Sequence, residues 1–338
     1  MKKTHFVFLI DDSAYRPMYE AMLADAAALE NVTILADVPN NNRIKDLLQK
    51  NKVRKLSGGC LDWLAYEKNA LYRTLDRLCP VWEQVVVVCF NAAFKWNPYV
   101  AGTLKRYQRI WKNLRYVLFY LDITTVPVSK CANYLREEGV FDLVYSIDSG
   151  DTQNYNLLPY STFYSADEKL SQISPSCGLY FCGVDKGRQE IIGAIAENAR
   201  QQDISYKIDL VCYNDCSMLE KYQPSLNLLP GNQFLPYCQV LENELHAHCI
   251  LDIVQPGQKA LTLRPYEAVV YNRKLLSNNR GILDFPFYNP AYMQYFESVD
   301  QIDWAWVKDD SPVDYRYNGS FSPLRLMDDI SRRLDNTQ

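Results

Sequence analysis

The chain has 338 residues, of which 48% are hydrophobic and 22% are charged, and its formal net charge is −4. This length is too great for one ordinary core and suits two α/β domains of about 150 residues each. The negative charge removes the general electrostatic case for a nucleic-acid partner, and no apolar run approaches the roughly 20 residues of a membrane-spanning helix.

Ten cysteines are spread along the chain, mostly within or beside apolar runs, and their spacing matches no zinc site. Buried, reduced thiols of this kind are typical of cytosolic proteins. We therefore expect a cytoplasmic location and no bound metal.

Short apolar runs alternate with amphipathic stretches in the first half of the chain. Runs rich in Val, Ile, Phe and Tyr predict buried strands at 5–10, 31–38, 84–90, 115–122 and 141–148. Two of the stretches between them, YEAMLADAAALE and YVAGTLKRYQRIWKN, have helical spacing. Since strands that alternate with helices favour a parallel sheet, we expect a Rossmann-like domain over residues 1–165.

The same alternation begins again after a polar segment, SADEKLSQISPSCG. The patterns predict strands at 178–185 and 206–215, a helix at 186–202, and a short strand or loop followed by a helix at 228–248. CILDIVQ and KLLSNN predict two further strands, with a helix that begins at Pro265 between them. We expect a second Rossmann-like domain over 176–320, and a C-terminal helix within 321–338 that packs back on the first domain.

Several predicted strands end in polar side chains. These are Asp11, Asp12, Asp122 and Asp148 in the first half, and Asp185, Asp215, Gln255 and Asn279 in the second. In open α/β sheets, ligands bind outside the carboxyl ends of the strands. Two Rossmann-like domains that face each other across a cleft would bring these residues to one ligand site.

Four segments of the second half resemble a known family. GVDKGR, ILDIVQPGQKALTLRPYEA, KLLSNN and DFPFYNP, over about 178–290, are similar to bacterial GT-B-type glycosyltransferase-like proteins of surface polysaccharide (capsule and lipopolysaccharide) biosynthesis. In the first half the resemblance covers the strand–helix layout and FDLVYSIDSGD. It implies the GT-B architecture, with a nucleotide-sugar donor held by the second domain and an acceptor held by the first.

The diphosphate of such a donor needs backbone N–H groups at a helix N-terminus and one or two cationic side chains. The loop after CILDIVQ supplies a glycine for close backbone approach, and we expect the helix from Pro265 to present free N–H groups. Arginine can hold two phosphate oxygens, whereas lysine acts as a point charge. The predicted donor-binding residues are Lys186, Arg188, Gly257, Gln258, Thr262, Arg264, Glu267 and Asn279.

Glu267 is the residue that we expect to accept hydrogen bonds from the ribose diol. The resemblance implies a pair of glutamates with seven residues between them, but position 259, where the first would stand, is Lys. We expect Gln258 to replace that first glutamate as a partner of the donor sugar.

Several of these residues have a purely structural alternative. Glu267 and Arg264 also suit the start of a helix. Lys186 and Arg188 suit a solvated helix start, and Asn279 suits a turn. Clustering of the polar residues at strand ends favours the ligand-binding interpretation.

Catalysis by inverting transfer needs a general base near the acceptor hydroxyl. Asp12, at the end of the first predicted strand, is the predicted base. Asp11, Asp122 and Asp148 are rivals, and each of the four could instead cap the helix that follows it. We expect no cofactor and no metal, because cations and a helix dipole neutralise the diphosphate, and we expect the donor to be UDP-linked.

The sequence therefore predicts a cytoplasmic, metal-independent glycosyltransferase that transfers a sugar to a glycan or lipid-linked acceptor in surface polysaccharide assembly. LKRYQRIWKNLRY (104–116) could rest on an anionic membrane, as a peripheral contact that suits a lipid-linked acceptor, or form an ordinary helix between two strands. Two rival functions are a nucleotide-sugar epimerase or hydrolase of the same fold, and a non-catalytic nucleotide- or sugar-binding partner in a polysaccharide assembly complex.

Overall fold

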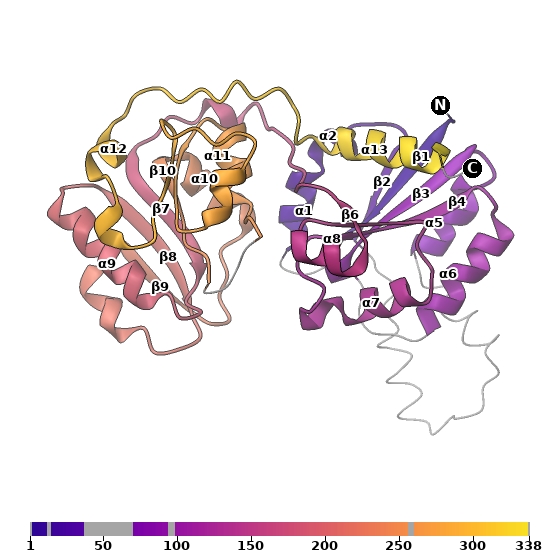
Figure 1. The fold of residues 1–338 in the computed structure, drawn as a ribbon, viewed down its shortest axis with the longest axis horizontal. Helices are drawn as coiled ribbons and strands as arrows, with labels where there is room; N and C mark the ends of the chain where they lie inside the picture. Colours follow the sequence, from indigo (N-terminus) through magenta and orange to yellow (C-terminus); the bar gives the residue numbers. More distant parts are fainter. Residues whose placement is uncertain (1, 12–14, 37–69, 94–98, 256–259, 337–338) are drawn as a thin grey trace. The chain divides into compact units, whose positions relative to one another are not determined.

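The structure, a computed structural model, describes residues 2–11, 15–36, 70–93, 99–255 and 260–336. Three residues with predicted roles, Asp12, Gly257 and Gln258, lie outside the described residues. The chain divides into two compact units: the N-terminal unit (residues 1–165 and 322–338) and the C-terminal unit (residues 166–321). Each contains a six-stranded parallel sheet (Figure 1).

In the N-terminal unit the strands lie in the order β2-β1-β3-β4-β5-β6. The strands are β1 Thr4–Leu9, β2 Val32–Leu35, β3 Gln84–Phe90, β4 Leu114–Tyr120, β5 Leu143–Ser146 and β6 Leu158–Pro159. The helices are α1 Arg16–Met22, α2 Ala24–Ala27, α5 Ala70–Leu78, α6 Tyr99–Ile110, α7 Lys130–Glu137, α8 Ser149–Tyr155 and α13 Pro323–Asn336. Helix α13 belongs to this unit, where Asp329 accepts a hydrogen bond from the hydroxyl of Tyr145 at 2.9 Å.

In the C-terminal unit the strands lie in the order β12-β11-β10-β7-β8-β9. The strands are β7 Cys177–Val184, β8 Tyr206–Cys212, β9 Leu226–Pro230, β10 Ala247–Asp252, β11 Lys274–Ser277 and β12 Met293–Tyr295. The helices are α9 Gln189–Gln201, α10 Tyr237–Leu245, α11 Arg264–Val270 and α12 Trp304–Lys308 (Figure 1).

The apolar runs form strands because a parallel sheet with helices on its faces buries both sides of each strand. Every residue of β3 is buried, and Leu75 of α5 and Leu104 of α6 pack in the same cluster as Val85 and Val87. In the C-terminal unit, Ile192 and Ile195 of α9 pack with Leu210 of β8. The predicted fold class, two α/β units with parallel sheets, is confirmed.

The basic and aromatic segment 104–116 lies in α6 and β4 and in the turn between them. Tyr107 and Tyr116 are buried, and Trp111 packs against the same core while its indole N–H donates to Asp76 at 3.3 Å. Its three aromatic rings therefore face the inside of the unit, as in an ordinary helix and strand. Within the described residues, no helix has the length and apolar character needed to span a bilayer.

Candidate functional site

The C-terminal sheet has a switch point between β7 and β10. From β7 the chain adds β8 and β9 on one side, and it then adds β10, β11 and β12 on the other. Because all six strands are parallel, their carboxyl ends meet at one edge of the sheet, and the connections after β7 and β10 diverge there. Ligands of open α/β sheets bind outside this edge. The candidate site is therefore the carboxyl edge of the C-terminal sheet.

The turn after β7 is organised by a buried carboxylate, Asp185. It accepts hydrogen bonds from the backbone N–H groups of Tyr213 and Asn214 and, at 2.6 Å, from the side-chain amide of Asn214. The amide of Gln189 donates to it at 3.2 Å. Burial by itself would raise the pKa of Asp185, but these hydrogen bonds favour the carboxylate and lower it. Asp185 thus ties the segment after β8 to the end of β7.

Two predicted donor-binding residues follow in the same turn. The half-buried guanidinium of Arg188 donates to the backbone carbonyls of Val184 and Ile253, which lie at the ends of β7 and β10. Burial lowers the pKa of Arg188. Lys186 is exposed, and its ammonium group forms no ion pair with any residue that the structure describes. Arg188 therefore stabilises the switch point, and Lys186 is the cation that a ligand can reach.

Helices α10 and α11 contribute a buried charge cluster, the Arg264 cluster, which consists of Tyr237, Glu244, Arg264 and Glu267. Arg264 lies 2.7 Å from Glu267 Oε2 through Nη1, and 2.7 Å from Glu244 Oε1 through Nε. The hydroxyl of Tyr237 donates to Glu267 Oε1 at 2.5 Å. Both glutamates have an exposed fraction of 0%. One arginine is thus shared by two buried acids.

The two glutamates differ in how well their oxygens are satisfied. Neither oxygen of Glu244 accepts a well-aligned hydrogen bond, although Arg264 Nε is close to one of them. Burial raises the pKa of Glu244 well above its usual value; Arg264 opposes this shift, and the neighbouring Glu267 adds to it. Burial would lower the pKa of Arg264, but the two acids raise it. Folding therefore favours the protonated form of Glu244, while Arg264 and Glu267 form an ion pair.

The variant Glu244→Gln tests this protonation. Because folding raises the pKa of Glu244, the folded protein holds a proton that the unfolded chain releases, so stability falls as pH rises above the unfolded value of about 4.3. Glutamine is always neutral and should remove this fall. The stability of the variant should match that of the wild type near pH 4. At higher pH it should exceed the stability of the wild type, by about 1.4 kcal/mol for each unit by which folding raises the pKa of Glu244.

Hydrogen exchange of β10 and α11 peptides, measured over this pH range, gives the local free energy of opening. Peptides of β3 in the N-terminal unit serve as the internal control, since no residue of that strand belongs to the cluster. If the wild type and Glu244→Gln show the same pH dependence in β10 and α11, Glu244 is ionised in the folded protein.

A second buried carboxylate, Asp252 at the end of β10, holds the chain before α11. Thr262 donates to its Oδ1 at 3.0 Å, and Ser277 donates to its Oδ2 at 2.7 Å. Burial raises the pKa of Asp252, and the two hydroxyl groups oppose that shift. Asn279, after β11, donates to the carbonyl of Ala260 at 3.0 Å. Thr262 and Asn279 therefore shape the loop that leads into α11.

The start of α11 does not present free N–H groups. The N–H of Arg264 donates to Thr262 Oγ1, and Pro265 has none. The N–H groups of Tyr266 and Glu267 both donate to the same backbone carbonyl of the preceding turn. The expectation that this helix start binds a diphosphate through free amides is wrong, because the chain itself uses them.

The structure groups the predicted donor-binding residues that it describes at the carboxyl edge of the C-terminal sheet. Lys186 and Arg188 lie in the turn after β7, and Thr262, Arg264 and Glu267 lie in the loop and helix after β10. Asn279 follows β11 and contacts that loop. The functions assigned to these residues stay predictions.

Two members of the Arg264 cluster, Tyr237 and Glu244, were not among the predicted residues. The buried face of α10 consists of Val240, Leu241, Glu244 and Leu245. A glutamate at an apolar position of helical spacing is a signal that sequence can supply, because buried charges require a partner. Nothing in the sequence indicates that this partner is Arg264, because β10 and the loop before α11 separate the two residues in the chain.

Two exposed aromatic side chains lie near the same edge. Tyr213, directly after β8, is 62% exposed, and Phe234, after β9, is 48% exposed. A Cβ atom at Gly231 would lie 2.8 Å from Cδ1 of Tyr213, so the glycine allows the ring to lie against the chain after β9. An exposed ring held in this way offers a face on which a flat base can stack.

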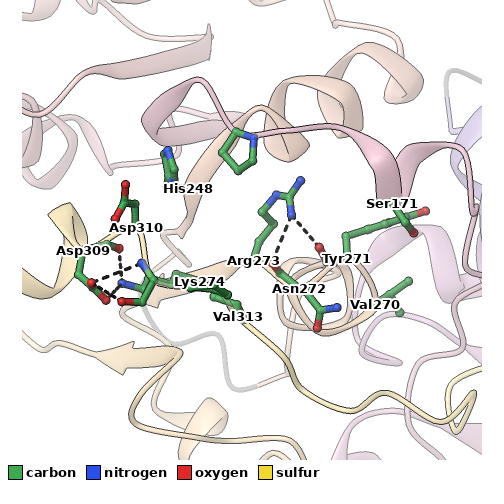
Figure 2. A pocket seen from close by; sticks show the side chains of 13 residues that line it. Ser171, His248, Val270, Tyr271, Asn272, Arg273, Lys274, Asp309, Asp310 and Val313 are labelled. Carbon is green, nitrogen blue, oxygen red and sulfur yellow. Dashed lines mark hydrogen bonds and ion pairs between the residues drawn. The ribbon is translucent and has the colours of Figure 1, made fainter.

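A cavity of about 300 Å³ lies at the amino ends of β10 and β11, the edge opposite to the candidate site (Figure 2). His248, Arg273 and Lys274 line it. Lys274 donates to Asp309 at 2.8 Å, which holds the pKa of Asp309 at about 2, and Arg273 donates to backbone carbonyls. Lys274 thus anchors the chain after α12, whereas Arg273 holds the carbonyls of Leu245 and Tyr271. Among the described residues no group of His, Cys, Asp and Glu could hold a metal ion.

The N-terminal unit has a cavity of about 330 Å³ next to the end of β5. Ser146, Asp148, Thr152 and Tyr160 are among its lining residues. Asp148 accepts a hydrogen bond from the N–H of Asp151 at 2.9 Å and so caps α8. This cavity also lies at the carboxyl end of a strand.

No protein-family model matches the chain, and no curated protein matches it. Solved structures that are similar to it include S. aureus TarM in complex with Fondaparinux, alpha-GlcNAc-glycerol and UDP, with 13% identity and a TM-score of 0.43, over 70% of this chain and 51% of that one. The chain thus spans about half the length of TarM.

Two further similar structures match over most of both chains. A putative UDP-N-acetylglucosamine 2-epimerase from Listeria monocytogenes has 8% identity and a TM-score of 0.46, over 100% of this chain and 98% of the other. An alpha-glucosyltransferase in complex with UDP and DNA has 11% identity and a TM-score of 0.45, over 82% and 80%. All of these TM-scores lie below 0.5.

Proposed function

We propose that the chain is a GT-B-type glycosyltransferase that binds a nucleotide-sugar, UDP-linked, at the carboxyl edge of its C-terminal sheet. The observation that carries the proposal is the set of chemically distinct groups around the switch point: an exposed cation, a buried carboxylate and an exposed aromatic ring, on Lys186, Glu267 and Tyr213. A nucleotide-sugar presents a diphosphate, a ribose diol and a flat base, which are the complements of these groups.

Each group has a role in this proposal. Lys186 neutralises the diphosphate as a point charge, without a metal ion. Glu267 accepts hydrogen bonds from the ribose diol, and Arg264 fixes its carboxylate in place through Oε2. Tyr213 stacks on the base. Arg188, with Thr262 and Asn279, keeps the surrounding loops in the shape that the donor requires.

We assign the acceptor, a glycan or a lipid-linked glycan of surface polysaccharide assembly, to the N-terminal unit. The cavity next to β5 is a site of suitable size for part of a sugar. Asp12 remains the predicted general base, and it lies outside the described residues. A lipid-linked acceptor would bring the protein to the inner face of a membrane as a peripheral contact.

A non-catalytic nucleotide-binding partner is the second candidate function. It is favoured by position 259, where Lys stands in place of the first glutamate of the pair that the family resemblance implies. An epimerase or hydrolase of the same fold is the remaining rival, and it would act on the donor without any acceptor.

Calorimetric titration of UDP-, GDP-, CMP- and dTDP-linked sugars tests the proposal. The wild type should bind a UDP-sugar, and Lys186→Ala should weaken that affinity by about 10–100-fold, since a hydrogen bond to a charged group contributes about 1.5–3 kcal/mol. Lys207→Ala is the matched control: Lys207 is also exposed, but it lies near the amino end of β8. It should leave the affinity unchanged.

If no nucleotide-sugar binds, or if both lysine variants respond equally, the donor site is wrong. If a nucleotide-sugar does bind, analysis of the reaction products separates the candidate functions. Binding without any turnover supports the non-catalytic partner, and free UDP or an altered sugar in the absence of acceptor supports the epimerase or hydrolase.

A further inference from the structure

Glu267 is a buried carboxylate whose two oxygens are engaged by different partners. Oε2 accepts from Arg264 at 2.7 Å, and Oε1 accepts from the hydroxyl of Tyr237 at 2.5 Å. The exposed fraction of Glu267 is 0%, so bulk solvent does not reach either oxygen in this conformation. A buried charged oxygen that loses its donor is strongly destabilising. Any ligand that binds Oε1 must therefore replace the Tyr237 hydroxyl with a donor of its own.

Tyr237 is well placed for such a replacement, because it is the first residue of α10. The side chains that bury α10 in the core begin at Val240, one turn later. Pro236, Cys238 and Gln239, which surround Tyr237 in the chain, are exposed. The start of the helix also has no side-chain cap. The first turn of α10 can therefore shift while Val240 and the residues after it stay packed.

The exchange conserves the chemistry at Glu267. A phenol hydroxyl and a ribose hydroxyl are both single O–H donors, so one hydrogen bond to Oε1 is lost and one is formed. Arg264 remains on Oε2 and keeps the carboxylate in position during the exchange. The buried charge is thus satisfied both before and after the ligand binds.

We propose that Tyr237 occupies the ligand position on Glu267 in the unliganded protein, and that the ribose diol of the donor displaces it together with the first turn of α10. This inference rests on the proposed function, since it names the step that admits the nucleotide-sugar to Glu267. It makes α10 a lid whose closed state competes with the donor.

Replacement of Tyr237 by phenylalanine removes the competing hydroxyl and keeps the ring. Tyr237→Phe should bind the UDP-sugar about 10-fold more tightly than the wild type, which corresponds to about 1.4 kcal/mol. Tyr180→Phe is the matched control, because Tyr180 also donates to a buried carboxylate, Asp209, at 2.8 Å, but within β7 and away from its carboxyl end. Its affinity should equal that of the wild type.

Hydrogen exchange of the wild type provides a second readout that does not depend on a variant. Addition of saturating UDP-sugar should increase exchange of the amides of Gln239 and Val240, which donate to the carbonyl of Pro236 ahead of the helix, against the usual protection by a ligand. It should leave the amides at 244–245, beyond the reach of the first turn, unchanged. A 2′,3′-dideoxy nucleotide has no diol and should not produce this increase.

The outcomes separate the two proposals. If the wild type binds a UDP-sugar but Tyr237→Phe binds it no more tightly, and the amides of Gln239 and Val240 gain protection, the lid is wrong and the donor site stands. If neither protein binds any nucleotide-sugar, the proposed function is wrong and the lid is wrong with it.

Discussion

Replacement of Arg264 by methionine is expected to lower the free energy of opening of β10 and α11 by about 3–5 kcal/mol, because removal of one partner leaves a buried charge uncompensated. Glu267, with an exposed fraction of 0%, would lose its only cationic neighbour in the cluster. Methionine retains most of the length and packing of the arginine stem, so the decrease in the free energy of opening measures the effect of removing the charge. Hydrogen exchange of β10 and α11 peptides in the full chain measures it.

The matched control is Arg200→Met. Arg200 pairs with Glu197 at the same helical spacing and at 2.8 Å, but its side chain is 68% exposed. Solvent screens such a pair, and we expect little or no change in stability. If Arg264→Met is as mild as Arg200→Met, the Arg264 cluster does not stabilise the unit, and Arg264 is available to hold a phosphate instead.

Replacement of Asp185 by alanine is expected to destabilise the switch point by about 2–4 kcal/mol, since each buried donor left unsatisfied costs about 1–3 kcal/mol. The backbone N–H groups of Tyr213 and Asn214 both donate to Asp185. Their release should raise hydrogen exchange of the segment after β8 most strongly. The affinity for a UDP-sugar should fall with it, because Tyr213 would lose its fixed position.

The pH dependence of this effect has a definite sign. Folding lowers the pKa of Asp185, so its contribution to stability is present above the unfolded value of about 3.9 and is lost as pH falls through the folded value. The difference between Asp185→Ala and the wild type should therefore shrink in acid. Asp215→Ala is the control: this exposed carboxylate accepts from the N–H of Ser217 in the same segment, and its loss should have a much smaller effect.

Most strands of the two sheets could be predicted from the sequence because their apolar runs are long enough to bury both faces. The strands β6 and β12, of two and three residues, have no such run and were not predicted. QVVVVCF coincides with β3, and HFVFLI differs from β1 by one residue at each end. Helix α11, expected from Pro265, begins at Arg264. The position of Lys186 and Arg188 after β7 also follows from the local pattern, but the helix expected from residue 186 begins at Gln189, so both residues lie in the turn before it.

The partners of the charged residues could not be predicted in the same way. Arg264 and Glu267 are three residues apart on one helix, so their contact is local. Glu244 and Tyr237 belong to α10, which β10 separates from α11 in the chain. Only the packing of the two helices brings these residues to Arg264 and Glu267. The amides at the start of α11, which the sequence alone suggests are free for a ligand, instead donate to Thr262 and Leu263 in the same turn.

The sequence by itself determined where strands and helices form, because burial of apolar side chains and helical spacing are properties of neighbouring residues. It also determined which polar residues stand at strand ends. Tertiary structure decided the strand order, and with it the switch point, because pairing joins strands that are far apart in the chain. It also decided that Asp185, Arg188 and Arg264 form their hydrogen bonds and ion pairs with other groups of the protein. A buried charge pairs with the nearest complementary group in space.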